Sequence, residues 1–350
     1  MQLCRVMLTM AAVLLPASAA QALDVVRTVD GQTINGTLNK MTDREVTITR
    51  VGSNEPTAVP VNQVESIQYE GEPPQLRLVR PLIANGNFEG ARQALENANL
   101  DPSKVTRTEA KQEILFFRAL TAARLARTAD EVKAAGAQMF EFVQSNPTNW
   151  HQFEAVQVLG DLLVAIGQVD QAAQQYAKLE NAPWPDVQMR GAVARARALQ
   201  SQGKPAEALA AYEKALQVAG NSNDGLVGAQ KLVATVGKAA CLADTGKAAE
   251  GIKLVEDVIA TAKPEDARLH AAAFTALGNC YLKSNPPQPK EAFLSFLKVD
   301  VLYPSFPEYH AEALYNLSKL WKEVQKPERG LQAKEELVRR YSTSPWASKD

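Results

Sequence analysis

The sequence contains little of what disulfide-rich domains and metal sites are built from. Its 350 residues include only three cysteines and three histidines. Beyond the first residues only Cys241 and Cys280 remain, which excludes a fold held by a framework of disulfides. The histidines, His151, His270 and His310, lie far apart in sequence, with no spacing typical of a ligand set. We therefore expect no metal and no other cofactor.

Sequence signatures of catalysis are also missing. The chain has no Gly-x-Ser-x-Gly elbow, no phosphate-binding glycine loop and no cysteine–histidine arrangement. Catalysis would need ionisable residues that converge in a cleft, and the sequence indicates no such cluster. It favours a protein that is not an enzyme.

The chain has no excess of either charge. Without residues 1–22, which contain Arg5 and no acid, 37 basic side chains face 39 acidic ones. Nucleic acids and anionic bilayers are normally bound by clustered positive charge. Neither is an expected partner.

The first residues lack an apolar run long enough to span a membrane. Residues 6–15 are apolar over about ten positions, against the roughly 20 that a spanning helix needs. Arg5 precedes this run and small residues follow it, which predicts a secretory signal cleaved at Ala19 or Ala22. An uncleaved anchor is the alternative. Cys4 precedes the run, so a lipoprotein is not expected. We expect a periplasmic or secreted protein with no integral span in the mature chain.

Short β-branched segments follow the predicted signal. They alternate partly between apolar and polar residues, which favours half-buried strands, at residues 25–29, 33–38, 46–49, 58–61 and 66–69. Asp30 and Gly31 predict a two-residue hairpin turn in which both central residues have positive φ. The segment resembles small SH3-like and Sm-like barrels at Asp30, Gly31, Gly36, Leu38, Val46, Ile48, Val64 and Ile67. The resemblance implies an adaptor or packing module, and RNA binding is not expected of an exported, near-neutral domain.

A second region begins near Pro73 and Pro74. Two prolines hold the chain extended, and the composition then turns rich in alanine, leucine, glutamine and glutamate. We therefore predict three parts: a signal peptide at residues 1–22, a small five-stranded, barrel-like β domain at 23–71, and a helical region at 72–350.

A turn glycine followed five residues later by a small residue recurs in the helical region. It appears as Gly86…Ala91, Gly167…Ala172, Gly203…Ala208 and Gly246…Gly251. The offsets of 36 and 43 residues between the last three glycines are typical of stacked helical hairpins. Gly160 and Ala172 are expected at a close helix crossing, and Gly167 at a left-handed helix end.

The segment from Leu159 resembles the tetratricopeptide repeat at Leu159, Gly160, Leu163, Gly167, Ala172 and Tyr176. The same frame fits later units, and residues 113–147 form a degenerate one without the turn glycine. The resemblance implies a mainly α protein, a right-handed α-solenoid of about six to seven hairpins. Another class of helical-hairpin array is the alternative.

The end of the chain carries a further resemblance. The run Tyr341, Ser344, Pro345 and Ala347 is similar to repeats of periplasmic tetratricopeptide proteins of the Tol-Pal and outer-membrane assembly systems. Those proteins scaffold envelope complexes. Aromatic residues also gather here, either as a docking patch or as a core that caps the array.

The tetratricopeptide resemblance implies a concave groove that binds a protein or peptide partner. It places six residues there: Gln157, Asp161, Asn279, Tyr315, Asn316 and Lys319. Asn279 and Asn316 match part of a carboxylate clamp, but Thr275 stands where the clamp has lysine, so solvated polar positions are the alternative. Cys241 and Cys280 are expected as buried thiols. The second functional hypothesis is a glycan or cell-wall binding module that uses the β domain.

Overall fold

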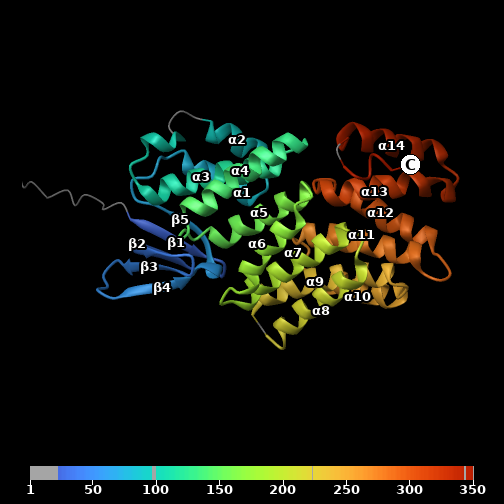
Figure 1. The fold of residues 1–350 in the computed structure, drawn as a ribbon, viewed down its shortest axis with the longest axis horizontal. Coiled ribbons are helices and arrows are strands. Elements are labelled where there is room, and N and C mark those ends of the chain that lie inside the picture. The colour runs from blue at the N-terminus through green and yellow to red at the C-terminus, as the bar shows by residue number, and fades with distance from the viewer. Residues whose placement is uncertain (1–22, 97–99, 223, 343, 350) are drawn as a thin grey trace, which may run out of the picture.

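The fold is a small antiparallel sheet followed by a curved array of paired helices (Figure 1). The computed structural model describes residues 23–96, 100–222, 224–342 and 344–349. The predicted signal peptide, with its Ala19 and Ala22 cleavage sites, lies outside these residues. The mainly helical fold with an N-terminal sheet confirms the predicted fold class.

The sheet contains five antiparallel strands in the order β4-β3-β2-β1-β5. Their inward side chains alternate with exposed ones, so that Val26, Ile48 and Ile67 are fully buried. The short helical turn η1 (Val61–Gln63) joins the last two strands. The strands are β1 (Asp24–Thr28), β2 (Thr33–Met41), β3 (Glu45–Arg50), β4 (Pro56–Pro60) and β5 (Val64–Gln68).

The first hairpin differs in detail from its prediction. Gly31 has a positive φ of 84°, but Asp30 does not, since Gln325 is the one non-glycine residue with positive φ in the described chain. The Gly31 amide donates to the Thr28 carbonyl at 2.9 Å, and the Asp30 carboxylate accepts from the Gln32 amide. The predicted positive φ at Asp30 was therefore wrong, since the turn is longer than two residues.

The rest of the described chain forms seven helical hairpins. Two further short helical turns, η3 (Pro102–Lys104) and η4 (Trp321–Val324), lie between helices. The pairs are α1 (Leu76–Ala84) with α2 (Phe88–Leu95), α3 (Thr108–Leu125) with α4 (Ala129–Ser145), α5 (Gln152–Ala165) with α6 (Val169–Glu180), α7 (Pro185–Ser201) with α8 (Pro205–Ala219), α9 (Gly225–Asp244) with α10 (Ala248–Thr261), α11 (Ala267–Lys283) with α12 (Pro289–Leu302), and α13 (Pro307–Leu320) with α14 (Pro327–Arg340).

The four predicted turn glycines end the first helices of their hairpins. Gly86, Gly167, Gly203 and Gly246 have φ values of 70°, 78°, 72° and 81°. This left-handed region is costly for residues with a Cβ. In the last hairpin Gln325 takes the left-handed conformation, with φ of 59°.

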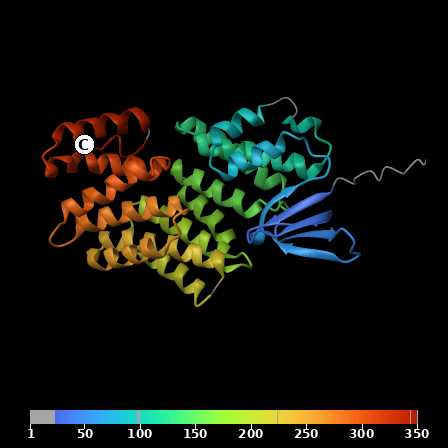
Figure 2. The same ribbon diagram turned by 180° about the vertical axis from the view of Figure 1, so that it is seen from behind.

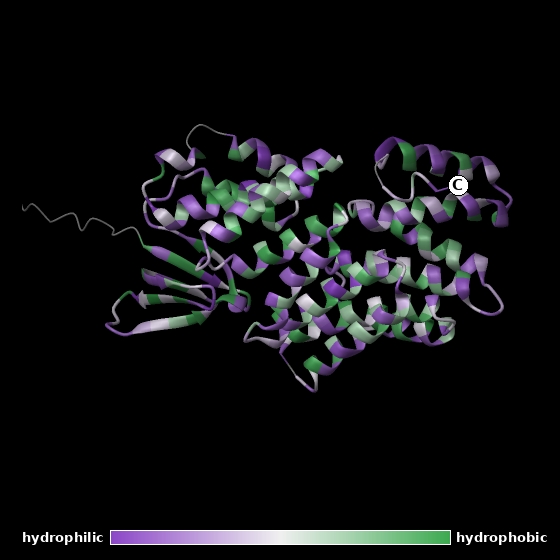
Figure 3. Cartoon of the chain, viewed as in Figure 1, coloured by the Kyte–Doolittle hydropathy of each residue, from purple (hydrophilic) through white to green (hydrophobic). Residues whose placement is uncertain are grey.

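Small residues let the two helices of a hairpin cross closely, as predicted. A Cβ on Gly160 would overlap the ring of Tyr176, and one on Gly278 would lie 2.7 Å from Phe296. Both aromatic side chains are almost fully buried. Hydrophobic and hydrophilic residues mix along the helices (Figure 3), as expected where one face of each helix is buried.

The sheet and the first hairpins share one hydrophobic core. This core is continuous from Val26 and Ile67 in the sheet to Ile114 and Leu159 in the helices. The Trp150 indole donates to the Tyr69 hydroxyl at 3.2 Å across the boundary. The sheet is therefore packed onto α1, α3 and α5 rather than held only by a linker.

A buried ionic cluster lies at this junction. The Arg80 guanidinium donates to Glu72 at 2.5 Å and to Glu113 at 2.6 Å, and all three side chains are at most 9% exposed. Burial raises the pKa of Glu113, although Arg80 opposes this. A second pair joins Arg107 to Asp24 at 3.1 Å.

Helix α9 is the one described helix long and apolar enough to cross a membrane by length and composition. It packs against α7, α8, α10 and α11. Val227, Ala234 and Cys241 of α9 lie in the core between these helices. Its hydropathy thus fits the core helix of a solenoid, and one such helix is weak evidence for a span.

Candidate binding groove

The first helices of the hairpins line the inner face of the array. Helices α3, α5, α7, α9, α11 and α13 each contact the next in this series. The second helices of neighbouring hairpins approach one another less closely. The array therefore curves, with the first helices on the concave side (Figure 1 and Figure 2).

Equivalent positions on these helices face the groove. Gly160 lies at its helix crossing, and the next residue, Asp161, is exposed. In the next hairpin Arg197 follows buried Ala196 in the same way and is also exposed. Asn279, which follows Gly278, is half-buried. A side chain just after the small crossing residue thus points into the groove.

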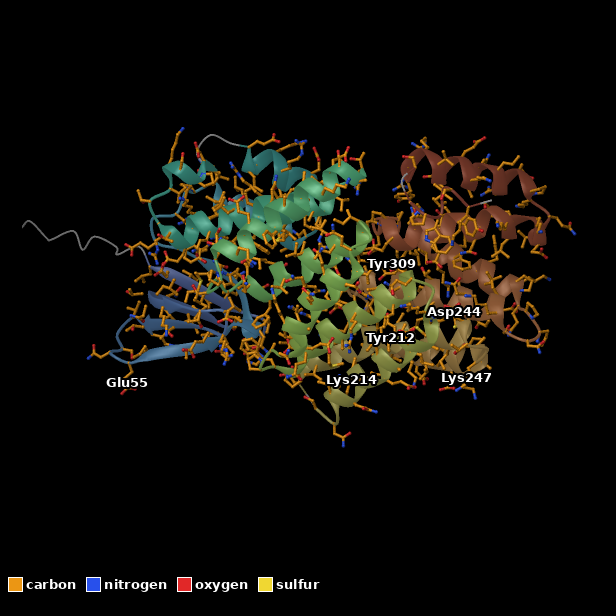
Figure 4. All side chains as sticks on the ribbon, viewed as in Figure 1. Glu55, Tyr212, Lys214, Asp244, Lys247 and Tyr309 are labelled. Atoms are coloured by element: carbon orange, nitrogen blue, oxygen red, sulfur yellow. The ribbon has the colours of Figure 1, made fainter. Side chains whose placement is uncertain are left out.

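Ionisable side chains of several hairpins influence Arg197 electrostatically. Arg197 interacts electrostatically with Asp161 of α5, Tyr212 of α8, and Glu308 and Tyr309 of α13. Figure 4 labels Tyr212 of α8 and Tyr309 at the start of α13.

Asp161 is a second centre of this cluster. Its carboxylate accepts a hydrogen bond from the Tyr176 hydroxyl at 2.9 Å. Desolvation by the surrounding groove raises the pKa of Asp161, although Tyr176 and the arginines Arg124, Arg197 and Arg268 oppose this.

The other groove carboxylates also have partners. The Arg268 guanidinium contacts the Glu308 carboxylate at 2.6 Å, which links α11 to α13. The Asn279 amide donates to Glu312 at 2.7 Å, and desolvation raises the pKa of this buried carboxyl despite that bond. The acidic groups of the groove are thus engaged by donors of the protein itself.

The structure divides the six predicted site residues between two places. Gln157 and Asp161 lie on α5, whereas Asn279 lies on α11 and three others lie on α13: Tyr315, Asn316 and Lys319. The Lys319 ammonium donates to the Tyr315 hydroxyl at 2.7 Å and lies 4.4 Å from the centre of its ring.

Asn316 does not reach the groove surface. Its side chain is almost fully buried, and its amide donates to the Glu312 carbonyl of the same helix at 3.0 Å. The sequences of α11 and α13 align through His270 and His310, because each histidine is the fourth residue of its helix and each is buried. In that register Asn279 corresponds to Lys319, so Asn279 and Asn316 do not form a matched pair.

Four arginines of the groove were missing from the predicted site: Arg124, Arg190, Arg197 and Arg268. One sequence signal could have found two of them. Arg190 lies six residues before Ala196, as Glu154 does before Gly160. Arg197 directly follows Ala196, as Asp161 directly follows Gly160. The repeat frame therefore predicts that α5 presents acids where α7 presents bases.

The carboxyl-terminal aromatic residues pack on the core of the last hairpins. Phe293 and Trp321 lie edge to face with ring centres 4.7 Å apart, and Trp346 lies 5.2 Å from Tyr315. Tyr341 accepts or donates a hydrogen bond with the buried His310 ring at 2.8 Å. These contacts give the aromatics a role in the core of the array end.

Comparison with known proteins identifies the repeat. Residues 188–314 match the family described as tetratrico peptide repeat. The helices within these residues are tetratricopeptide repeats. Tetratricopeptide repeats generally bind proteins or peptides and are not catalytic modules. The predicted resemblance to the tetratricopeptide repeat is confirmed by this match.

Several solved structures match part of this chain, each with a TM-score below 0.5. PilW, a widely conserved type IV pilus biogenesis factor, is 18% identical, covers 67% of this chain and 96% of its own, with a TM-score of 0.42. BtubC from P. vanneervenii is 15% identical, covers 64% of this chain and 90% of its own, and has a TM-score of 0.40. The apo form of the quorum sensor NprR from B. thuringiensis is 14% identical, covers 76% of this chain and 86% of its own, and has a TM-score of 0.44. No curated protein matches the chain.

Proposed function

We propose that this protein is a non-enzymatic scaffold of the cell envelope that holds a segment of a partner protein in the groove. The observation that carries this proposal is the row of first helices, each in contact with the next, which presents exposed Asp161 and Arg197 at equivalent positions of α5 and α7. A surface assembled from separate hairpins suits an extended chain better than a small molecule.

The envelope location rests on the predicted export signal. Arg5, the apolar run and the small residues near Ala19 and Ala22 support export. In this proposal the mature protein acts in the periplasm or outside the cell, and its partner is an exported or membrane-attached protein.

The alternative, a glycan or cell-wall module built on the sheet, has less support. Sugar-binding surfaces commonly use exposed aromatic rings, and Tyr69 is the one aromatic residue between residues 23 and 71. Tyr69 is 2% exposed and lies beneath the guanidinium groups of Arg80 and Arg107. Sedimentation of the full chain with purified wall polymer would favour this alternative.

The scaffold proposal is tested by recovering partners from the native envelope. We expect Asp161→Lys combined with Lys319→Glu to abolish recovery of a partner that the unaltered chain captures. Lys334→Glu on the exposed face of α14 is the matched control and should retain the partner. Recovery of the same partner with the groove variant would overturn the proposal.

A further inference from the structure

Two arginines form a cationic pair along the inner face of α7. Arg190 and Arg197 are seven residues apart, which places them on one face of the helix about 10.5 Å apart along its axis. Arg197 is exposed and Arg190 is half-buried. We call this the α7 arginine pair.

The α7 arginine pair has unused capacity for hydrogen bonds. Within the described ranges no carboxylate lies within 4 Å of either guanidinium, whereas Arg268 on α11 is paired with Glu308. The Arg190 Nε group is buried and has no hydrogen-bond partner among the residues that the structure describes. A buried donor without a partner is destabilising, so a ligand that accepts from it would be bound favourably.

The carboxylates nearest to the pair are held elsewhere. Asp161 accepts from the Tyr176 hydroxyl, and Glu154 contacts the Nδ1 atom of His151 at 3.4 Å. Asp186, four residues before Arg190 on α7, accepts a hydrogen bond from the Asn62 amide at 3.0 Å. All three influence the arginines electrostatically without forming an ion pair with them. The charge available to a ligand on α7 is therefore positive.

The spacing of the α7 arginine pair selects an extended peptide. An extended polyproline II chain has three residues per turn and advances about 3.1 Å per residue, so side chains three residues apart lie on one face, roughly 9 Å apart. A guanidinium binds a carboxylate through two parallel hydrogen bonds. We propose that α7 binds an extended acidic segment of the partner protein, with two carboxylates three residues apart. This inference rests on the proposed scaffold function and names the chemistry of the bound segment.

The neighbouring helix argues against a nucleic acid at this site. Glu154 and Asp161 repeat the same seven-residue spacing on α5, beside the α7 arginine pair. A phosphodiester chain carries a negative charge at every residue and would meet these acids. A peptide can place its carboxylates only on α7 and present basic or neutral residues to α5.

The test measures binding of defined peptides to the full chain by fluorescence anisotropy at low ionic strength. The probe is a blocked, fluorescein-labelled peptide of sequence Gly-Glu-Leu-Ala-Glu-Leu-Gly. Its controls are the same peptide with both glutamates replaced by glutamine, and one with the two glutamates adjacent. We expect the probe to bind about tenfold more tightly than either control, the worth of one charge-assisted interaction.

Variants of the pair complete the test. Arg190→Gln and Arg197→Gln should each weaken probe binding about tenfold, whereas Arg339→Gln on exposed α14 should not. Arg197→Lys keeps the positive charge but cannot form two parallel hydrogen bonds with a carboxylate, so it should lose part of the affinity for the probe peptide. Equal binding of the glutamate and glutamine peptides to the unaltered chain would overturn this inference without need of any variant. If the groove variants still lost the envelope partner in that case, the scaffold function would stand and only the ligand chemistry would fail.

Discussion

At the scale of single residues, the repeat depends on two glycine roles that differ physically. Turn glycines such as Gly167 are required by their positive φ, and a Cβ added to Gly167 would meet no atom within 4 Å. Crossing glycines such as Gly160 have helical backbones and are required by the ring that covers them. The sequence could predict both roles, because each recurs at a fixed place in the repeat.

Gly160→Ala tests the crossing role. A Cβ at this position would overlap the Tyr176 ring, and overpacking of this kind destabilises by about 1–3 kcal/mol. Gly136→Ala in α4 is the matched control, because a Cβ there meets nothing within 4 Å and should stabilise the helix by about 0.5–1 kcal/mol. Urea unfolding of the three chains measures both changes. Equal stability of Gly160→Ala and the unaltered chain would contradict the packing account.

The two cysteines are predicted to be unreactive in the folded protein. Cys241 and Cys280 are fully buried thiols, and burial raises the pKa of each to about 12. The thiolate is the nucleophile, so alkylation at pH 8 should be very slow. Peptide-level mass spectrometry after iodoacetamide treatment should find both unmodified until denaturant is added. Rapid labelling of either residue in the native protein would contradict its buried position.

At the scale of elements, the junction between sheet and helices is the part that the sequence did not reveal. The strands and hairpins could be predicted from β-branched runs and repeated glycines. Their shared core could not, because it joins Val26 to Leu159 across more than a hundred residues. Buried Glu72 and Glu113 also resemble ordinary surface acids until Arg80 is placed between them.

Arg80→Ala tests the importance of this junction. Removal of the guanidinium leaves Glu72 and Glu113 as buried carboxylates without a cation, which costs about 3–5 kcal/mol. The control is Arg92→Ala, which removes exposed pairs with Glu89 and Glu96 and should cost far less, because solvent screens these pairs. Denaturant unfolding measures the two losses. Similar losses for both variants would show that the buried cluster does not hold the sheet in place.

Helix register explains why part of the predicted groove differs from the structure. The carboxylate-clamp resemblance paired Asn316 with Asn279, but the buried histidines align Asn279 with Lys319. A shift of three residues rotates a side chain by about 300° around the helix axis, about 60° short of a full turn, so the two positions do not point in the same direction. Asn316 therefore falls on the buried side of α13, whereas Lys319 stays exposed.

At the scale of the whole molecule, curvature creates the groove. The repeat frame predicts which side chains face inward, but not that Glu308 and Tyr309 of α13 influence Arg197 of α7 electrostatically. That influence depends on small rotations between successive hairpins, which add up along the array. The surroundings of the groove arginines can therefore be described only in the folded solenoid and not from the sequence.

The central claim is that a partner protein lies in this groove, and site-specific photocrosslinking in the native cell tests it most directly. A photoreactive amino acid would replace Gln157 on the inner face of α5 or, as the matched control, exposed Gln332 on α14. The account predicts one discrete crosslinked partner from Gln157 and none from Gln332. Capture of the partner from Gln332 but not from Gln157 would contradict it.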